Sequence, residues 1–337
     1  MCGIVGIYCA EGINSNFKVK LRDACNKMQH RGPDESGYWY DDSNIVSFGH
    51  RRLSIIDIKS GQQPMMNEKG NLVITFNGEI YNFQELRQEL TSKGFIFRTN
   101  SDTEVILNLY DAYGTDSFER LNGIFAFGIY DLKKKELIIA RDQYGVKPVY
   151  YIDKFDTVAF ASEIKALLEL NIVQKEVDVE ALNGNIAYRF SPSPETLFKD
   201  VKKLYPGCYI KVNKYEVRLG SYVKFVPNID TSISIEDALS KYSNLLNDAV
   251  KRQMMSDVPV GMLLSGGIDS AIVCNFMQAN SNDNIHTYTV GFEGVGKYNE
   301  LAFAKETANI LGTNHNELII SEKEYFDFFE WPAKSLL

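Results

Sequence analysis

The arrangement of apolar runs changes near the middle of the chain, and this change constrains the fold more than any other feature. Up to about Tyr209, short β-branched and aromatic runs follow one another across brief polar turns, as in Ile124–Tyr130, Leu137–Ala140 and Val149–Ile152. Consecutive runs of this kind favour antiparallel sheet. A helix is also indicated after Ser101, where Ser101 and Glu104 match a capping box. The first part of the chain is therefore predicted to be a mixed α+β domain.

The second part of the chain alternates strands with helices. Apolar runs predict strands over Val258–Leu264, Ile285–Phe292 and Glu317–Ile320, and helical patterns lie between them at Ser270–Gln278 and Glu300–Leu311. This βαβαβ order argues for a parallel sheet of the doubly wound type.

The length and the loss of periodicity between these parts predict two domains. A chain of 337 residues is long enough for two hydrophobic cores. The aperiodic stretch ahead of the second part reads as an ordered linker. We therefore expect a first domain over residues 2–212, a linker over 213–233 and a second domain over 234–337.

Charge and cysteine content exclude several classes of protein. The chain has 36 basic and 44 acidic side chains, so its formal net charge of −8 supplies no basic field for nucleic acid or an anionic membrane. No 18-residue apolar run is present, and the N-terminus lacks the basic region of a signal peptide. Five scattered cysteines and four dispersed histidines predict neither a disulfide framework nor a protein metal cluster. We expect a cytoplasmic protein with reduced thiols and with no nucleic-acid or membrane partner.

Cys2 is the strongest candidate nucleophile. Removal of Met1 would leave a thiol and a free α-amine on one residue, and these groups titrate near pH 8.5 and 7.7–8.0 respectively. The amine can then act as the base for its own side chain. The following sequence Gly3–Ile7 reads as a strand, which would hold the nucleophile at a sheet edge. The alternative is an ordinary cysteine at the second position.

Four further residues have side chains or backbone groups suited to an amide substrate. Asn77 and Gly78 offer an amide side chain beside a glycine N–H, two donors that together would make an oxyanion hole. An Asn-Gly pair is also typical of a hairpin turn, which is the alternative here. Arg52 could clamp a carboxylate, and Asp102 could receive an ammonium group. Their alternatives are a surface ion pair for Arg52 and a favourable helix first-turn position for Asp102.

A glycine-containing turn follows the first predicted strand of the second domain. A strand-to-helix turn of this kind can hold phosphate through its backbone N–H groups, its serine hydroxyls and the helix N-terminus. It is not a Walker A loop because it has no Gly-Lys-Ser/Thr sequence, but Asp269 could help to organise Mg²⁺. The alternative is a tight turn without a ligand. The turn consists of Leu264, Ser265, Gly266, Gly267, Ile268, Asp269 and Ser270.

These segments together resemble the glutamine-dependent asparagine synthetase family over essentially the whole chain. The first part is similar to a class II glutamine amidotransferase domain, and the second to an ATP-pyrophosphatase domain. The order of the last two motifs distinguishes this family from other synthases that share the glutaminase half. The motifs are Cys2–Gly6, His30–Asp34, His50–Asp57, Asn77–Asn82, Ser101–Asp102, Arg141–Pro148 and Ser265–Ser270.

The resemblance implies a fold and a set of roles. The expected fold is an N-terminal nucleophile αββα sandwich followed by an incomplete α/β parallel-sheet domain. Cys2 would be the nucleophile, with Asn77 and Gly78 as the oxyanion hole. The resemblance further places Arg52, Glu79 and Asp102 around glutamine, assigns the pyrophosphate of ATP to Ser265–Ser270, and assigns the adenosine site to Leu264 and Val290.

The implied reaction makes asparagine. Ammonia released from glutamine at Cys2 would attack an aspartate activated by ATP as an acyl-adenylate, giving asparagine, glutamate, AMP and diphosphate. ATP and Mg²⁺ are the expected cofactors; glutamine, aspartate and ATP are the expected substrates, and a homodimer is left open. The chain ends earlier than family members do, so we expect a truncated synthetase half.

Three alternatives to an asparagine synthetase stay open at this point. The chain could act as a glutaminase alone, in which the ATP loop is vestigial. It could transfer ammonia to another carboxylate, such as a sugar acid. It could also be a non-catalytic nucleotide-binding or regulatory fragment.

Overall fold

The chain forms two compact units. The computed structural model describes residues 1–223, 226–294, 296 and 299–328. The units are Met1–Val226, here called the N-terminal unit, and Pro227–Leu337, the C-terminal unit.

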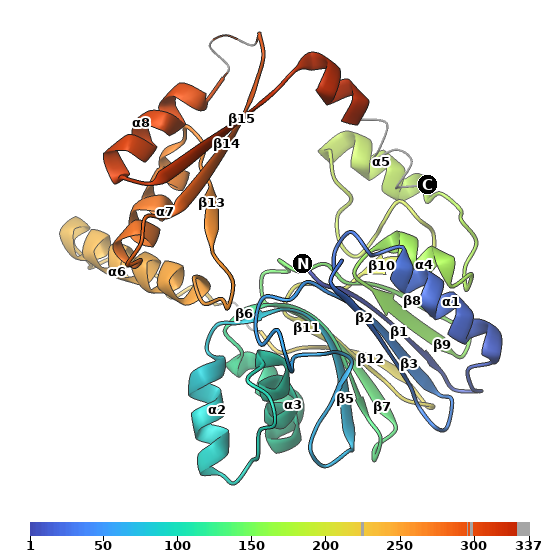
Figure 1. Cartoon of the computed structure of the whole chain (residues 1–337). Coiled ribbons are helices and arrows are strands. Elements are labelled where there is room, and N and C mark those ends of the chain that lie inside the picture. The colour runs from blue at the N-terminus through green and yellow to red at the C-terminus, as the bar shows by residue number, and fades with distance from the viewer. Residues whose placement is uncertain (224–225, 295, 297–298, 329–337) are drawn as a thin grey trace. The chain divides into compact units, whose positions relative to one another are not determined.

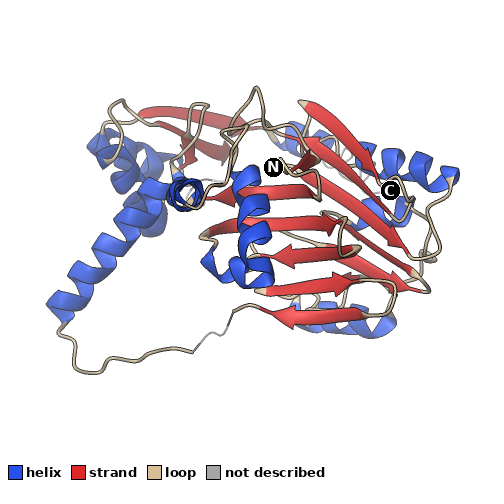
Figure 2. Ribbon diagram, turned by 90° about the horizontal axis from the view of Figure 1, so that it is seen from below, coloured by secondary structure: helices blue, strands red, loops and turns tan. Residues whose placement is uncertain are grey.

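Two six-stranded antiparallel sheets form the frame of the N-terminal unit (Figures 1 and 2). The strands are β1 (Gly3–Cys9), β2 (Glu35–Tyr40), β3 (Val46–Arg52), β4 (Met65–Met66), β5 (Leu72–Ile80), β6 (Gly123–Asp131), β7 (Glu136–Arg141), β8 (Tyr150–Lys154), β9 (Thr157–Ala161), β10 (Lys202–Lys203), β11 (Cys208–Val212) and β12 (Val217–Ser221). Their order is β10-β8-β9-β1-β3-β2 in the first sheet and β12-β11-β7-β6-β5-β4 in the second.

Helices lie on the outer faces of both sheets. The helices of this unit are α1 (Ser15–Asn26), α2 (Phe83–Ser92), α3 (Asp102–Tyr113), the 3₁₀ helix η1 (Gly114–Arg120), α4 (Ile164–Glu169) and α5 (Val179–Tyr188). Helices α1 and α4 share a buried apolar cluster with β1, while Phe48, Tyr130 and Phe160 fill the space between the sheets. Helix α3 packs on β5 and on α2. These four layers confirm the predicted αββα sandwich.

Two local predictions for this unit differ from the structure. The stretch 213–233, predicted as a linker, contains β12, which continues the second sheet by pairing with β11. The capping box ahead of α3 does not form, because the Glu104 carboxylate accepts hydrogen bonds from the backbone of Arg98 and Thr99 instead. The Ser101 hydroxyl alone caps the helix, by accepting from the Thr103 N–H.

The C-terminal unit contains a parallel sheet in the order β13-β14-β15. Its elements are α6 (Ile235–Gln253), β13 (Gly261–Leu263), α7 (Ile268–Ala279), β14 (His286–Phe292), α8 (Leu301–Leu311) and β15 (Asn314–Ile320). The predicted parallel sheet is confirmed. The doubly wound arrangement is not seen in the described residues, because the strand order does not reverse and both crossover helices therefore fall on one face.

One face of this three-stranded sheet is buried and the other is exposed. On the helix side, Leu264 packs with Cys274 of α7 and with Ala304 and Ala308 of α8. On the opposite face, alternate residues of the strands are exposed over 40% to 78% of their surface, namely Leu263, Tyr288, Val290, Phe292 and Leu318.

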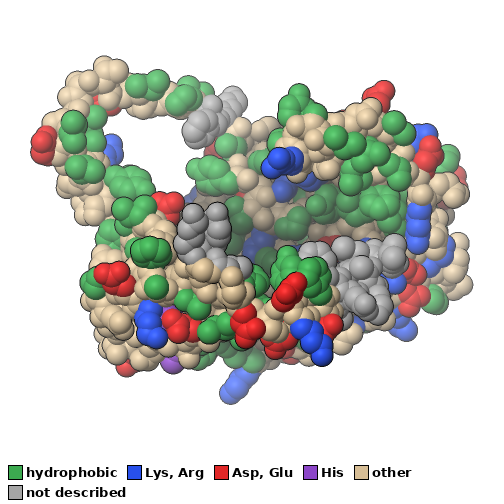
Figure 3. All heavy atoms as spheres, turned by 90° about the horizontal axis from the view of Figure 1, so that it is seen from above, with side chains coloured by type: hydrophobic (Ala, Val, Ile, Leu, Met, Phe, Trp, Pro, Cys, Tyr) green, Lys and Arg blue, Asp and Glu red, His purple; other side chains and the backbone are tan. Residues whose placement is uncertain are grey.

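Surface chemistry adds two observations on the described part of the chain. No helix there combines the length and the apolar character needed to cross a bilayer, and no three histidine, cysteine or acidic side chains are grouped as metal ligands. On the face drawn in Figure 3, acidic and basic side chains are interspersed with groups of hydrophobic ones.

Candidate active site

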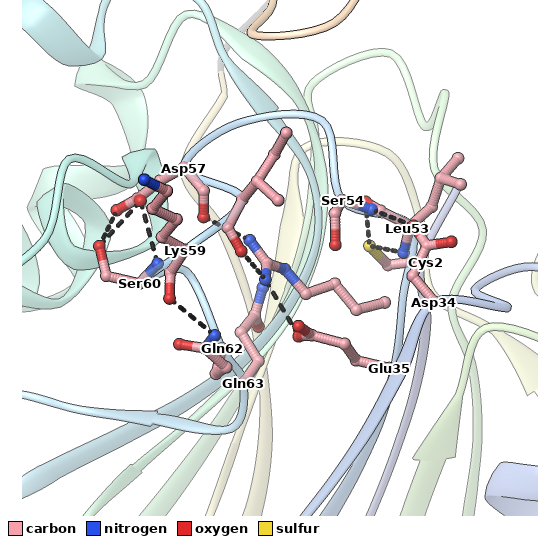
Figure 4. A network of polar contacts seen from close by, with 12 residues as sticks. Cys2, Asp34, Glu35, Leu53, Ser54, Asp57, Lys59, Ser60, Gln62 and Gln63 are labelled. Atoms are coloured by element: carbon pink, nitrogen blue, oxygen red, sulfur yellow. Dashed lines mark hydrogen bonds and ion pairs between the residues drawn. The ribbon is translucent and has the colours of Figure 1, made fainter.

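The Cys2 thiol is held beside the loop that follows β3. Its Sγ accepts a hydrogen bond from the Leu53 N–H at 3.4 Å and lies 3.7 Å from the Leu53 carbonyl oxygen, to which it can donate (Figure 4). Burial raises the pKa of this thiol, and the Leu53 N–H lowers it by a smaller amount. The thiol therefore needs a nearby base before it can act as a nucleophile.

An amine lies next to that thiol. The N-terminal amine is carried by Met1, and burial is the largest cause that lowers its pKa, with Lys147 and Arg31 adding to the effect. The guanidinium of Arg31 also donates to the Cys2 carbonyl oxygen at 2.9 Å and pairs with Glu163. These contacts fix the start of the chain, and removal of Met1 would bring the free amine onto Cys2 itself.

Asn77 and Gly78 lie inside strand β5, so the hairpin-turn interpretation is wrong. They pair with Ala126 and Phe125 of the neighbouring strand β6. A Cβ at Gly78 would come within 2.2 Å of the Ile124 carbonyl oxygen, which explains why glycine occupies this position. Asn77 is 1% exposed, and its Nδ2 has no hydrogen-bond partner among the residues that the structure describes.

Two acidic side chains lie near the same strand. Asp102 accepts hydrogen bonds from the Ile80 N–H at 3.1 Å and from the Ser101 hydroxyl at 3.4 Å. Its burial raises the carboxyl pKa to about 6, with the charge of Glu79 contributing in the same direction. Burial also raises the pKa of Glu79, while Lys147 and the N-terminal amine lower it. Such carboxylates can hold an ammonium group in a partly desolvated site.

Arg52 is buried, but its guanidinium does not present an open fork to the cavity. One terminal nitrogen donates to Glu35 at 3.0 Å and to the Ile58 carbonyl oxygen at 3.2 Å. The other donates to the carbonyl oxygens of Ile56 and Asp57 at 3.2 and 2.6 Å. At 4% exposure the side chain is not a surface ion pair either. In this structure Arg52 shapes the loop after β3, and a carboxylate would have to displace some of these acceptors.

The six residues predicted to act on glutamine line one cavity. They are Cys2, Arg52, Asn77, Gly78, Glu79 and Asp102. The sequence analysis missed other members of the wall, among them Leu53, Gln63, Thr103 and Lys147. The motifs His50–Asp57 and Arg141–Pro148 were the available signal, since they contain Leu53 and Lys147.

The motif Arg141–Pro148 forms a tightly bonded loop. The Asp142 carboxylate is fully buried and accepts from the backbone N–H groups of Phe125, Val146 and Lys147. The Arg141 guanidinium donates to the Lys147 carbonyl oxygen and to two others. This bonding sets the backbone of Lys147 at the cavity wall.

The turn at residues 265–270 of the C-terminal unit is closed by its own serines. The hydroxyls of Ser265 and Ser270 lie 2.8 Å apart, and the Gly267 N–H donates to the Ser265 hydroxyl at 3.2 Å. Gly267 caps helix α7, which begins at Ile268. The Gly266 N–H donates to the Glu300 carboxylate at 3.1 Å. The turn thus presents a backbone donor to an anionic oxygen.

The remaining predicted ATP residues do not all share one surface. Leu264 is 2% exposed and packs under α7 and α8, whereas the Val290 side chain lies on the opposite face of the sheet. Their side chains therefore do not line a common adenosine surface. Asp269 is exposed in the first turn of α7, and Ile268 is 74% exposed.

Comparisons with known proteins show which family the chain belongs to. Residues 1–223 match the family model described as a glutamine amidotransferase domain, and residues 241–334 match the one described as asparagine synthase. Asparagine synthetase [glutamine-hydrolyzing] 1 of Bacillus subtilis is 40% identical over 97% of this chain and 51% of its own length. Asparagine synthetase B of Escherichia coli is 32% identical over 97% and 55%. A protein of Methanocaldococcus jannaschii named as a glutamine-hydrolysing asparagine synthetase is 33% identical over 98% and 68%.

Solved structures support the fold. A glutamine phosphoribosylpyrophosphate amidotransferase of Bacillus subtilis aligns with a TM-score of 0.50 at 19% identity, over 94% of this chain and 65% of that one. An allosteric regulatory enzyme of purine biosynthesis aligns with a TM-score of 0.52 at 16% identity, over 95% and 80%.

The N-terminal unit is thus a glutamine amidotransferase domain, and its cavity brings together the six residues expected to bind glutamine. The chain belongs to the family of glutamine-hydrolysing asparagine synthetases. It spans about half the length of the first curated relatives that it matches, 51% and 56%.

Proposed function

We propose that the N-terminal unit hydrolyses the side-chain amide of glutamine at Cys2 and releases ammonia. The observation that supports this most directly is the Asn77 Nδ2, a buried donor that no described residue pairs with, at the wall of the cavity that contains Cys2. A buried donor left unpaired costs about 1–3 kcal/mol, so its retention is expected where a ligand supplies the missing acceptor. In an amide hydrolase that acceptor is the oxyanion.

The reaction proceeds through a thioester. After loss of Met1, the α-amine of Cys2 takes the thiol proton while Sγ attacks the amide carbon, and the oxyanion accepts from Asn77 Nδ2 and the Gly78 N–H. The carbon–nitrogen bond then breaks, the amine returns its proton to the leaving nitrogen, and ammonia departs. Water attacks the thioester by the same route and regenerates the thiol with release of glutamate. Glu79 and Asp102 hold the α-ammonium group of glutamine.

The second half of the proposal concerns the C-terminal unit, in which the acceptor of the ammonia would be activated. We propose that residues Ser265–Ser270 bind the pyrophosphate of ATP and that the released ammonia converts an activated aspartate to asparagine. Binding of a phosphate here is supported by the Gly266 N–H, which donates to the Glu300 carboxylate, an anionic acceptor in the place that a phosphate oxygen would take. Mg²⁺ would neutralise charge on the triphosphate. Asp269, the acidic residue of the turn, would help to hold this ion.

A glutaminase without ligase activity is the second candidate. It is favoured by one observation: every residue assigned to glutamine lies in the N-terminal unit, while the Gly266 and Gly267 N–H groups of the turn at 265–270 are already bonded within the chain. A related enzyme acting on a sugar acid also stays open. Cytoplasmic location, a lack of nucleic-acid partners and a homodimer remain predictions from the sequence.

Two measurements on the purified chain test the proposal. Intact mass reports whether Met1 is absent, and glutamate release from glutamine should then be lost in Cys2→Ala. Addition of ATP, Mg²⁺ and aspartate should yield pyrophosphate if the chain is a ligase, and no pyrophosphate if it is a glutaminase alone. A chain that retains Met1 and releases no glutamate would overturn the glutaminase proposal.

A further inference from the structure

Lys147 contributes a basic side chain to the glutamine cavity that the proposed reaction does not use. The loop Arg141–Pro148 holds its backbone from both sides: the Lys147 N–H donates to Asp142 at 2.9 Å, and the Lys147 carbonyl oxygen accepts from Arg141 at 2.8 Å. Asp142 and Arg141 themselves are not part of the cavity wall. The loop therefore delivers one lysine to the cavity from a scaffold that lies outside it.

The ammonium of Lys147 lies within electrostatic reach of the reacting groups. The side chain lines the same cavity as Cys2 and Glu79, and the residue is 8% exposed. Among the described residues its ammonium has neither a hydrogen bond nor an ion pair, so its charge is not neutralised by direct contact. Burial lowers the pKa of Lys147, whereas Glu79, Cys2 and Asp142 raise it and Arg31 lowers it.

We propose that Lys147 is a positioning residue whose positive charge keeps the α-amine beside Cys2 unprotonated and favours the Cys2 thiolate. The inference rests on the proposed glutaminase function. Lys147 acts through the amine and the thiol, and it takes no part in bond making.

Lys147 has this effect because a protonated α-amine would be a second positive charge placed near the Lys147 ammonium. A buried cation repels a protonated amine and attracts a thiolate, and both effects are weakly screened inside a cavity. Burial lowers the pKa of the N-terminal amine most; Lys147 and Arg31 lower this pKa further, while Cys2 and Glu79 raise it. Burial disfavours the Cys2 thiolate most, the Leu53 N–H, the N-terminal amine and Arg52 favour it, and Asp102 disfavours it. The charge of Cys2 in turn raises the pKa of Lys147.

The test compares three variants on the chain that has lost Met1. Lys147→Met removes the charge, Lys147→Arg keeps it, and Lys133→Met removes an exposed lysine in the turn between β6 and β7 as a control. Lys147→Gln serves as a second neutral variant if the methionine variant does not fold. The measurements are the pH profile of kcat/KM for glutamine and the pH profile of Cys2 alkylation by iodoacetamide, followed by peptide mass.

We expect the acidic limb of both profiles to move upward by about one pH unit in the neutral variants. It should stay in place in Lys147→Arg and Lys133→Met. Unmoved limbs in a folded neutral variant would overturn the proposal, as would an equal movement in Lys147→Arg. If the unmodified chain releases no glutamate, the function fails, but the alkylation profile still decides the role of Lys147.

Discussion

The sheets of the two units are covered differently. In the N-terminal unit two sheets pack face to face, and Phe48 and Phe160 between them are fully buried. In the C-terminal unit one sheet face carries the helices, and the other exposes Leu263 over 78% of its surface and Val290 over 45%. The first unit therefore closes its hydrophobic core with its own residues, whereas the described part of the second leaves an apolar sheet face open.

The candidate sites of the two units differ in the same way. In the cavity that contains Cys2, the Asn77 Nδ2 is buried and has no partner within the described part of the chain, so a donor is in place for the proposed oxyanion. In the turn at 265–270, the Gly266 N–H is bonded to Glu300 and the two serine hydroxyls are bonded to each other. A phosphate would have to replace these contacts. The first unit therefore holds a donor ready for a ligand, whereas the donors named for the turn of the second unit are bonded to groups of that unit.

The largest expected effect concerns the unpaired donor. Asn77→Ala should lower kcat for glutamine hydrolysis by about 10²–10³-fold, because one oxyanion donor is lost. The melting temperature should not fall through loss of an Nδ2 hydrogen bond, since Nδ2 makes none with the residues that the structure describes. Steady-state kinetics and thermal melting check both statements.

Asn108 provides a matched control for this variant. It is also buried, and its Nδ2 also has no partner in the described ranges, but it lies on α3 away from the wall of the cavity that contains Cys2. Asn108→Ala should leave kcat within about twofold, as expected away from the reacting atoms. Equal losses in both variants would show that the Asn77 amide does not serve the oxyanion.

The second largest effect compares the free energy of unfolding after the same substitution on a buried and on an exposed sheet face. Val73 lies between the sheets of the N-terminal unit and is fully buried, whereas Val290 is on the exposed face of β14. A Val73→Thr change places a hydroxyl in an apolar core and should cost about 1–3 kcal/mol of unfolding free energy. Val290→Thr should change it by less than about 0.5 kcal/mol. Hydrogen exchange resolved by region measures each unit separately, and a comparable loss at Val290 would show that this face is covered.

The pH dependence of glutamine binding comes third. The Asp102 pKa is raised from its ordinary 3.8 to about 6, so the carboxylate is charged above that pH and neutral below it. KM for glutamine should rise about tenfold per unit as the pH falls below this value, because the ammonium group loses its partner. Asp102→Asn should raise KM at neutral pH and flatten this dependence. A wild-type KM that is constant between pH 5 and 7 would contradict the assignment.

The same raised pKa predicts a stability effect of opposite sense. A carboxyl that binds its proton more tightly when folded stabilises the folded chain at low pH and loses that contribution as the pH rises towards about 6. Asp102→Asn should therefore raise the melting temperature at pH 7.5 and change it less at pH 4. Asparagine keeps an acceptor for the Ile80 N–H, so this backbone contact is retained.

Periodicity predicted most of the strands but not their partners. The runs Ile124–Tyr130 and Leu137–Ala140 are neighbouring strands, as expected. The next run, Val149–Ile152, includes most of β8 and pairs in the other sheet, because the loop Arg141–Pro148 carries the chain from one sheet to the other. The local pattern that gives each strand its period contains no information about this crossing.

Site prediction shows the same limit. The motifs predicted which residues gather around Cys2, and the cavity contains all six of them. They did not predict that the Arg52 guanidinium is bonded to backbone carbonyls of its own loop, nor that Lys147 enters the cavity wall. Both depend on loop conformations fixed by contacts distant in sequence. The Asn77-Gly78 pair was ambiguous for a related reason, since strand pairing with β6 decides between a turn and a donor pair.

The smallest expected effect concerns the anion held by the turn of the C-terminal unit. Glu300 accepts from the Gly266 N–H at 3.1 Å, so its charge competes with any phosphate at that donor. Glu300→Gln keeps an acceptor but removes the like charge, worth about 0.5–1 kcal/mol at a partly exposed site, and should tighten pyrophosphate binding about two- to fivefold. Glu306→Gln, on an exposed residue of the same helix region, is the control. Titration calorimetry with pyrophosphate measures the change. Weaker binding in Glu300→Gln would mean that the Glu300 carboxylate holds the turn in its binding conformation and does not compete with phosphate for the Gly266 N–H.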